Sequence, residues 1–289
     1  MKTAPENTND YLSGRGAQLN TDNKYLKNSI TKEHVEGIDD WEITNEKTSF
    51  IIGNSKSIVN KVESPDVNML YSLNPYQGCE HGCIYCYARN SHEYWGFSAG
   101  LDFERKIIVK QDAPELFKKF LEKKNWQASP ITISGNTDCY QPCERKYKLT
   151  RQLLQIALDY KQPIFMITKN ALILRDLDIL QELAKHQLVS VFVSITSLNE
   201  SLRQKLEPRT TTAKQRLKVI EQLSLANLPM GVMAAPMIPG LNNHEIPAIL
   251  KASADVGAES AGYTVVRLNG SISKIFEDWL SKNFPDRFE

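Results

Sequence analysis

The chain has 289 residues, 41% of them apolar, with 35 lysine and arginine residues against 34 aspartate and glutamate residues. This apolar content is enough for a sizeable core and excludes a wholly disordered protein. The formal net charge of +1 gives no global electrostatic reason to bind nucleic acid. No apolar run approaches the roughly 18 residues of a membrane span, and the start lacks a signal-peptide apolar segment. We therefore expect a cytoplasmic protein without a membrane partner.

Residues 1–65 differ in character from the rest of the chain. They are rich in Asn, Thr, Ser and charged residues, and 49–52 is their one obvious β-prone segment. We predict an irregular N-terminal arm over 1–65 that packs on a domain over 66–289. A plain disordered leader is the competing interpretation of the arm.

From about residue 66, short apolar runs alternate with amphipathic helical segments. The runs predict six buried strands, at 69–73, 131–134, 164–168, 189–194, 231–235 and 262–266. The segments between and after them predict helices at roughly 113–124, 149–160, 175–186, 213–225, 244–256 and 273–282. A further run at 106–110 predicts an additional edge strand.

This repeat of strand and helix predicts an α/β fold with parallel strands and right-handed crossovers. Six units are too few to close an eight-stranded barrel. An open, partial (β/α)6 barrel or a doubly wound sheet fits the pattern. Both place the functional site at the carboxyl ends of the strands.

The five cysteines fall into a group of three, Cys79, Cys83 and Cys86, and a pair, Cys139 and Cys143. Because they are few, odd in number and clustered, they indicate ligands or reactive thiols in a reducing compartment, not a disulfide framework.

The group of three has the spacing C-x3-C-x2-C and follows directly on the first predicted strand. Three thiolates close in sequence can hold three irons of a [4Fe–4S] cube and leave the fourth iron without a protein ligand. The alternative is a zinc site with His81 or His92 as the fourth ligand.

The sequence around these cysteines resembles a known family. C-x3-C-x2-C with an aromatic residue before the last cysteine, opening a six-fold βα repeat, is similar to the radical S-adenosylmethionine (SAM) superfamily. The strings 74–79, 83–89 and 135–142, with 14–17 of the arm, resemble its spore photoproduct lyase-related (DNA repair photolyase-like) branch, and within it a bacterial subgroup of unsettled function. The resemblance covers about 12–289, and it implies that the chain stops short of its relatives' C-terminal end.

The resemblance implies a radical-SAM-type partial (β/α)6 barrel. It also implies a [4Fe–4S] cluster held by Cys79, Cys83 and Cys86, with SAM bound at the open iron. Reductive cleavage of SAM then gives a 5′-deoxyadenosyl radical, which abstracts hydrogen from a substrate. A reductant such as flavodoxin or ferredoxin is the implied partner. The substrate stays unidentified.

The resemblance also assigns polar groups at the strand ends to SAM. Thr137 and Asp138 match the segment that receives the methionine amino group, with a helix-capping pair as the alternative. Lys169 matches a contact to the methionine carboxylate or ribose, against an ordinary solvated lysine. Ser194 matches a polar residue at the cofactor, although a serine can also simply end a strand.

Three later residues complete the expected cofactor site. Arg209 is a candidate partner for a carboxylate, with a surface arginine as the competing interpretation. Ile238, in a proline-rich turn after the fifth strand, and Thr264, near the sixth strand, are candidates for contact with adenine. Burial in the core is the alternative for both.

Two tyrosines bear on the reaction. Tyr85 and Tyr87 flank Cys86 as the radical-relay tyrosines do in spore photoproduct lyase. Tyr85 also fills the aromatic position of the superfamily, and there it would only shield the cluster.

The second cysteine group is the most open question. The lyase returns a hydrogen atom from a cysteine whose place aligns with Asn136 here, with Cys139 and Cys143 slightly later. These two thiols are candidates for a hydrogen-atom donor, a redox pair or ligands of a second cofactor; two packed thiols are the alternative. After them comes a basic cluster expected at the rim of the site, which could hold an anionic substrate: Arg145, Lys146, Lys148 and Arg151.

The leading hypothesis is therefore a radical SAM enzyme with an unidentified substrate. A lyase-like DNA repair enzyme would need base flipping and a DNA-binding surface, which the near-neutral charge does not favour. The rival from another class is a non-catalytic zinc-binding module.

Overall fold

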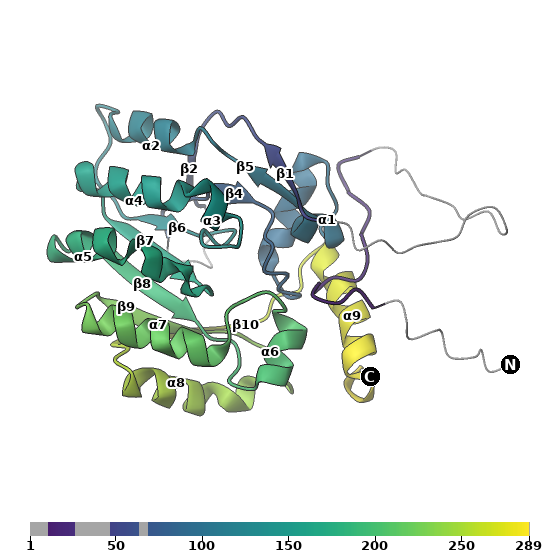
Figure 1. Ribbon diagram of the computed structural model, residues 1–289. Helices are drawn as coiled ribbons and strands as arrows, with labels where there is room; N and C mark the ends of the chain where they lie inside the picture. Colours follow the sequence, from purple (N-terminus) through teal and green to yellow (C-terminus); the bar gives the residue numbers. More distant parts are fainter. Residues whose placement is uncertain (1–10, 27–46, 64–68, 289) are drawn as a thin grey trace, which may run out of the picture.

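The computed structural model describes residues 11–26, 47–63 and 69–288, and its framework is a largely parallel sheet (Figure 1). The described strands of this sheet follow the order β10-β9-β8-β7-β6-β3-β2. The strands that pair in parallel, in chain order, are β3 (Tyr71–Leu73), β6 (Ile131–Ile133), β7 (Ile164–Thr168), β8 (Val189–Ser194), β9 (Met230–Met237) and β10 (Ser260–Val265). The predicted α/β fold with a partial (β/α)6 framework is confirmed.

Most of the helices bury their apolar stripes against the sheet, whereas the last helix packs its stripe on residues 83–85. The predicted helices are present as α2 (Ala113–Leu121), α4 (Leu149–Asp159), α5 (Leu177–Lys185), α7 (Ala213–Leu225), α8 (Ile246–Asp255) and α9 (Ser271–Asn283). Three short helices were not predicted, because four to seven residues give too little periodicity: α1 (Leu101–Arg105), α3 (Glu144–Tyr147) and α6 (Glu200–Leu206). No helix in the described part of the chain is long and apolar enough to cross a membrane.

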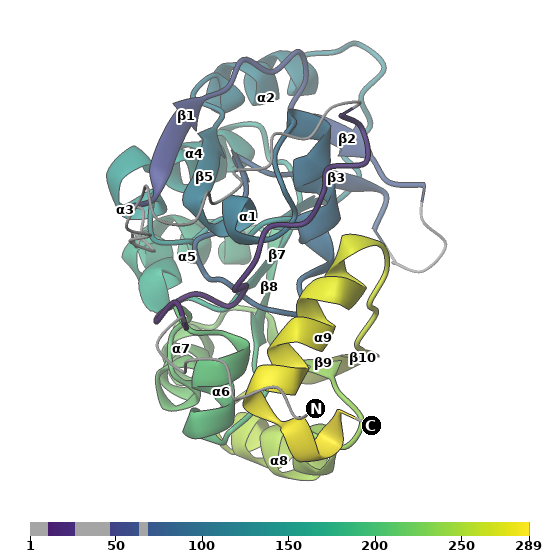
Figure 2. The ribbon, with the colours of Figure 1, turned by 90° about the vertical axis from the view of Figure 1, so that its right-hand side faces the viewer.

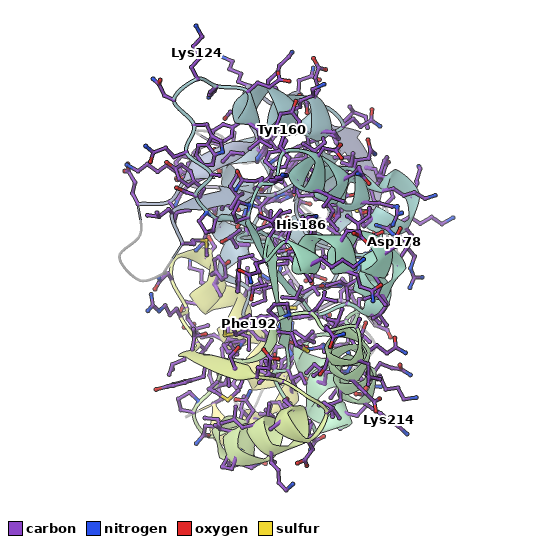
Figure 3. All side chains as sticks on the ribbon, turned by 90° about the vertical axis from the view of Figure 1, so that its left-hand side faces the viewer. Lys124, Tyr160, Asp178, His186, Phe192 and Lys214 are labelled. Carbon is purple, nitrogen blue, oxygen red and sulfur yellow. The ribbon has the colours of Figure 1, made fainter. Side chains whose placement is uncertain are left out.

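The direction of the helices shows where the strands end. Figure 3 views the end of the sheet at which α4 and α5 finish, at Tyr160 and His186. Because helix and strand run in opposite directions in a βα repeat, the carboxyl ends of the strands lie at the opposite end of the molecule. That end is the one toward α1 and α6 in Figure 1.

A second, small sheet has the order β1-β5-β4 and corrects two expectations. The run predicted as an edge strand is β5 (Lys106–Val109), but it is the central strand, with β1 (Ser49–Ile52) on one side and β4 (Tyr76–Gln77) on the other. The described segment 47–63 is not irregular, since it carries β1 and β2 (Val59–Lys61), and β2 pairs antiparallel with β3. Local patterns could not predict this, because the partners are distant in sequence.

Residues 11–26 contain no helix or strand, and they run past α1 (Figure 2). They are fixed to the domain through Glu104 of α1. The buried carboxylate of Glu104 accepts hydrogen bonds from the N–H groups of Gly16 (3.1 Å) and Ala17 (2.8 Å). It also pairs with the buried guanidinium of Arg89 (2.5 Å). Arg15 donates to the Glu104 carbonyl (2.9 Å). The buried ion pair of Glu104 and Arg89 therefore satisfies both of its charges, as burial requires.

The arm lies directly against the cysteine loop, 79–86. A Cβ atom at Gly16 would stand 1.8 Å from the carbonyl oxygen of Gly82, so no side chain fits there without moving the backbone. The glycine of the arm is required by this close approach.

Replacing Glu104 by Gln should lower the free energy of unfolding by about 3–5 kcal/mol, because it removes the anion from a buried ion pair and leaves Arg89 unpaired. Urea denaturation measures the change. The matched control is Glu115→Gln, since Glu115 is exposed and forms a surface pair with Lys119 one turn later (2.6 Å), and it should change stability little. Equal effects of the two substitutions would contradict this account of the arm.

Candidate active site

Hydrogen bonds to neighbouring segments hold the backbone of the cysteine loop in place. Three hydrogen bonds fix it, from the N–H of Cys79 to the carbonyl of Phe103 (2.9 Å), from Ile84 to Leu206 (3.0 Å) and from Arg209 to His81 (3.2 Å). Arg89 adds a bond from its side chain to the carbonyl of Cys83 (3.0 Å). The loop has no regular structure of its own. Its shape therefore depends on bonds from α1, from α6 and from the 3-10 helix Tyr87–Trp95, which contains Arg89.

The segment 139–143 braces the same loop. The side chain of Gln141 accepts a hydrogen bond from the N–H of Glu80 (3.0 Å) and donates one to the carbonyl of Gly78 (3.0 Å). The N–H of Cys143 donates to the Glu80 carboxylate (2.7 Å). The segment therefore supports the site through an amide side chain and its backbone.

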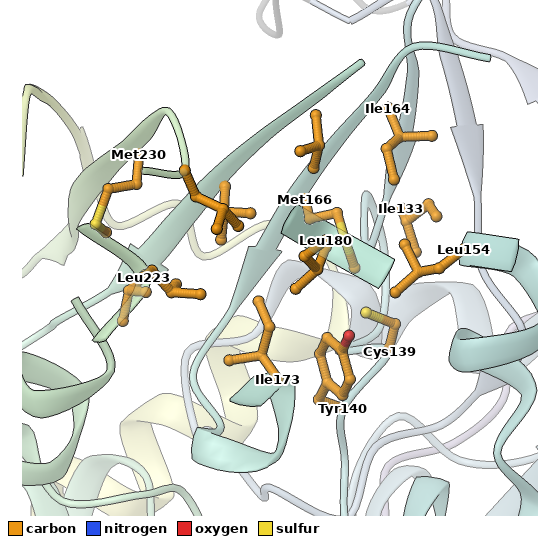
Figure 4. Close-up of a cluster of buried hydrophobic side chains, with 14 of the residues drawn as sticks. Ile133, Cys139, Tyr140, Leu154, Ile164, Met166, Ile173, Leu180, Leu223 and Met230 are labelled. Atoms are coloured by element: carbon orange, nitrogen blue, oxygen red, sulfur yellow. The ribbon is translucent and has the colours of Figure 1, made fainter. Parts of the chain in front are cut away.

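Its two thiols lie in different apolar clusters. Cys139 is fully buried in the main core, beside Tyr140 and Leu154 (Figure 4). Cys143 packs with Tyr76 and Leu149 in a smaller cluster. Burial raises the pKa of both thiols well above the ordinary range, which favours the unreactive neutral form. This placement supports the packed-thiol interpretation over a redox pair.

Cys79, Cys83 and Cys86 are close enough to influence one another electrostatically. Burial raises the pKa of each thiol, and at Cys79 the charge of Asp138 and then the two neighbouring thiols add to the rise. Metal binding would supply the positive charge that such thiolates need.

The donor set can be compared with the two candidate groups. One zinc ion needs sulfur atoms about 3.8 Å apart around a single centre, given tetrahedral geometry with bonds of about 2.3 Å. A [4Fe–4S] cube instead binds each thiolate to a separate iron. The three thiols of the loop act on one another electrostatically, so they lie close together. Three thiols on one loop fit the cube, because each could bind a separate iron.

Lys169 lies at the centre of a polar cluster where β7, β8 and β9 end. Its ammonium group donates to the hydroxyls of Ser194 (2.7 Å) and Thr196 (3.1 Å) and pairs with the carboxylate of Glu207 (3.0 Å). It also lies 5.7 Å from the ring centre of Tyr85 in the cysteine loop. The structure thus brings the predicted residues Lys169 and Ser194 together, since the carboxyl ends of parallel strands meet at one edge.

Glu207 is the residue of this cluster that the sequence analysis missed. Its fully buried carboxylate accepts a hydrogen bond from the hydroxyl of Tyr85 and pairs with Arg216 (2.5 Å). Burial alone would raise the pKa of Glu207, but the charges of Arg216 and Lys169 bring it well below its usual range. In the sequence, Glu207 is marked only by its place beside Arg209, the predicted partner of a carboxylate.

Thr137 and Asp138 are occupied by partners within the protein. The buried hydroxyl of Thr137 donates to the carbonyl of Tyr76 (2.7 Å). The carboxylate of Asp138 accepts hydrogen bonds from the hydroxyl of Thr168 (2.8 Å) and from the N–H groups of Lys169 (2.8 Å) and Tyr140 (2.9 Å). A ring nitrogen of His81 lies 3.4 Å from it. Asp138 therefore ties the ends of β6 and β7 to the cysteine loop.

The remaining cofactor candidates are spread more widely. The side chain of Arg209 is exposed, and it is its backbone that touches the cysteine loop. Ile238 is buried in one apolar cluster with Cys83 and Tyr85, so it lies beside the loop. Thr264 is exposed on β10, at the edge of the sheet.

The two tyrosines beside Cys86 face different environments. Tyr85 is buried under the loop, with its hydroxyl bonded to Glu207 and 3.1 Å from that of Thr196. Tyr87 is 60% exposed, and its hydroxyl donates to the carbonyl of Gly135 (2.5 Å). The structure therefore places Tyr85 in a buried position and Tyr87 in a solvent-facing one.

Comparisons with known proteins agree with this geometry. The sequence model of the Radical SAM superfamily matches residues 73–252. An uncharacterised protein of Mycobacterium tuberculosis, strain H37Rv, is 32% identical over 234 residues, covering 80% of this chain and 69% of that protein. An uncharacterised protein of Methanocaldococcus jannaschii is 26% identical over 246 residues, covering 85% and 87% of the two chains.

Solved structures with a similar fold include radical SAM enzymes. A spore photoproduct lyase variant with bound AdoMet and dinucleoside spore photoproduct has a TM-score of 0.63 at 16% identity, over 87% of this chain and 72% of that chain. SuiB of Streptococcus suis bound to S-adenosylmethionine has a TM-score of 0.51 at 14% identity, over 73% and 45% of the two chains. At these identities the likeness concerns the fold alone.

The matched region includes the three cysteines of the loop as well as Lys169 and Glu207. The family implies a [4Fe–4S] cluster and SAM as cofactors, and an enzyme that receives electrons from an external reductant. A non-catalytic zinc-binding module is thereby replaced as an explanation of the cysteines. The chain belongs to the radical SAM superfamily.

Proposed function

We propose that this enzyme cleaves SAM reductively at its [4Fe–4S] cluster and abstracts a hydrogen atom from an organic substrate. The observation that carries the proposal is the position of the three-cysteine loop beside the polar cluster of Lys169, Ser194 and Glu207 at the strand ends. When bound, the cluster and SAM supply the one-electron chemistry. The protein supplies ligands, orientation and a site with little water.

Cys79, Cys83 and Cys86 would hold the cluster through three of its irons. Lys169 and Ser194 would receive the methionine carboxylate of SAM. Lys169 suits this role because its ammonium is held in place by protein oxygens and yet its side chain stays 17% exposed to a ligand. An ammonium group and a hydroxyl at neighbouring strand ends make a strong anion-binding pair.

Other residues act on the site through their neighbours. Asp138 positions the backbone of Lys169 and the ring of His81, in place of the direct SAM contact expected from the resemblance. Tyr85 would shield the cluster from solvent, since it is buried beside Cys86 and tied to Glu207. The free cysteines support a reducing compartment such as the cytoplasm, with flavodoxin or ferredoxin as the reductant.

The proposal as a whole is tested by anaerobic reconstitution of the full chain with iron and sulfide, followed by reduction and addition of SAM. The expected result is a brown protein that releases 5′-deoxyadenosine, measured by liquid chromatography. Stoichiometric zinc without the nucleoside product would overturn the proposal.

Substitution of the cysteines tests the assignment of ligands. Cys83→Ala should lose the cluster absorption and the formation of 5′-deoxyadenosine, because one iron loses its thiolate. Cys139→Ala is the control, since Cys139 is buried in the core away from the other thiols, and it should keep the cluster at some cost in stability. Product formation by Cys83→Ala, or cluster loss in Cys139→Ala alone, would contradict the assignment.

Glu207→Gln should weaken SAM binding by about 10–100-fold, because Lys169 and Arg216 lose the anion that orients them. Equilibrium binding of SAM to the reconstituted protein measures this. Glu245→Gln is the matched control, because Glu245 accepts bonds from Ser197 (2.7 Å) and Leu198 (2.6 Å) in the neighbouring loop. If both variants bound SAM as the unsubstituted enzyme does, Glu207 would have no positioning role.

Repair of a DNA lesion is a second candidate, favoured by the fold likeness to spore photoproduct lyase. Two observations weigh against it. Asn136, where the hydrogen-returning cysteine aligns, uses its amide to bond Gln77 (3.2 Å) and Ser91 (3.1 Å). In the basic cluster, Arg151 is already paired with Asp178 (2.7 Å).

We therefore expect dinucleoside spore photoproduct to remain unaltered when it is incubated with the enzyme under conditions that produce 5′-deoxyadenosine. Mass spectrometry of the dinucleoside decides the question. Restored thymidine residues would establish the repair reaction in place of the broader proposal for the substrate.

A further inference from the structure

A pocket lies where three segments of the chain meet, outside the proposed SAM site. Its walls come from α6, from the turn between β9 and α8, and from the segment that follows α9, and these elements meet in the lower part of Figure 2. The pocket has a volume of about 230 Å³. None of its described lining residues is one that we assign to the cluster or to SAM. The pocket is therefore a second candidate site.

Hydrogen bonds between the three segments hold the walls of the pocket in place. The ammonium group of Lys205 on α6 donates to the carbonyl of Asn283 (3.4 Å), and the indole of Trp279 donates to the carbonyl of Lys205 (3.0 Å). Arg287 donates to the carbonyl of Gly240 in the turn. Because each wall is bonded to another, a ligand can enter with little rearrangement of the chain.

Two cations of this pocket converge on one aromatic ring. The Nζ atom of Lys205 lies 4.6 Å from the ring centre of Phe284, and the Cζ atom of Arg287 lies 5.9 Å from the same centre. Within the described parts of the chain, neither cation forms an ion pair with a carboxylate, and their partners are this ring and carbonyl oxygens. The pocket thus holds two positive charges that a ligand can neutralise.

Carboxylates close to the pocket in sequence are engaged elsewhere. Glu200 pairs with Arg203 on α6 (2.7 Å). Glu245 accepts hydrogen bonds from the hydroxyl of Ser197 (2.7 Å) and from the N–H of Leu198 (2.6 Å). The described lining of the pocket includes no aspartate or glutamate. Its charge therefore favours an anionic ligand.

The remaining lining residues indicate which class of anion fits. His244, Ser201 and Asn199 add side chains that can donate hydrogen bonds to oxygen atoms. A guanidinium group can bind two oxygens of a phosphate at once, and an ammonium group adds a compact charge. Leu202 and Leu241 are buried and form an apolar part of the wall.

We infer that this pocket binds a small phosphate monoester with an apolar body. Lys205 and Arg287 hold the phosphate, whose charge of nearly −2 at neutral pH matches the two cations. The two leucines contact the body of the ligand. The volume is smaller than the roughly 300–1,000 Å³ of pockets for drug-sized molecules, so the ligand has the size of a single phosphorylated ring.

Isothermal titration of the reconstituted full chain with phenyl phosphate tests this inference. Phenyl phosphate should bind at least about tenfold more tightly than inorganic phosphate, because its ring can bury apolar surface against Leu202 and Leu241. Saturating SAM should leave the affinity for phenyl phosphate unchanged, since the two sites share no residue. Equal affinities for the two phosphates, or competition between phenyl phosphate and SAM, would overturn the inference.

Substitutions show where phenyl phosphate binds. Lys205→Gln and Arg287→Gln should each weaken its binding at least about tenfold, because each removes one of the two cations. Lys124→Gln is the matched control. It also removes an exposed cation, but at the far end of the molecule from α8 (Figure 3), and it should leave the affinity unchanged.

Circular dichroism establishes that each variant is folded before it is titrated. The side chain of Arg287 is exposed, so Arg287→Gln decides the question even if Lys205→Gln does not fold. Unchanged affinity in folded Arg287→Gln would overturn the inference. An equal loss of affinity in Lys124→Gln would overturn it as well, because the anion would then respond to the overall charge and not to the pocket.

Discussion

The backbone of the cysteine loop is the feature that the rest of the structure supports. In the function that we propose, the three thiols of this eight-residue loop point toward one metal cluster, and a regular helix or strand would direct them apart. The shape of the loop is therefore imposed by hydrogen bonds from α1, α6, the segment 139–143 and Arg89. The arm closes the outer side of the loop through Gly16. These elements are widely separated in sequence, so the loop takes its geometry only in the folded domain.

Two buried carboxylates organise the two sides of this loop. Glu104 gathers Arg89 and the arm on the outside, and Glu207 gathers Arg216, Lys169 and Tyr85 on the inside. A buried carboxylate is costly unless cations and hydrogen-bond donors surround it. The need to satisfy it limits the arrangements open to its neighbours, and this is how each carboxylate fixes the position of groups near the proposed cluster.

In the segment 139–143, the residues that contact the cysteine loop are not the thiols that the sequence suggests. Its cysteines suggest thiol chemistry, but they are buried in separate apolar clusters. The contacts to the cysteine loop come from Gln141 and from the N–H of Cys143. The string thus serves the site as a brace, and its thiols contribute to packing.

The sequence by itself determined the six parallel strands, their main helices and the three-cysteine motif, because hydrophobic periodicity and ligand spacing are local properties. It also placed Lys169 and Ser194 at one edge, since parallel strands end together. Only the tertiary structure decided that β5 lies at the centre of a second sheet, that Glu207 and not Arg209 carries the buried charge, and that the arm clamps the cysteine loop. Each of these features depends on contacts between segments that are distant in the sequence. Periodicity and spacing are local patterns, so they do not predict which distant segments will pair.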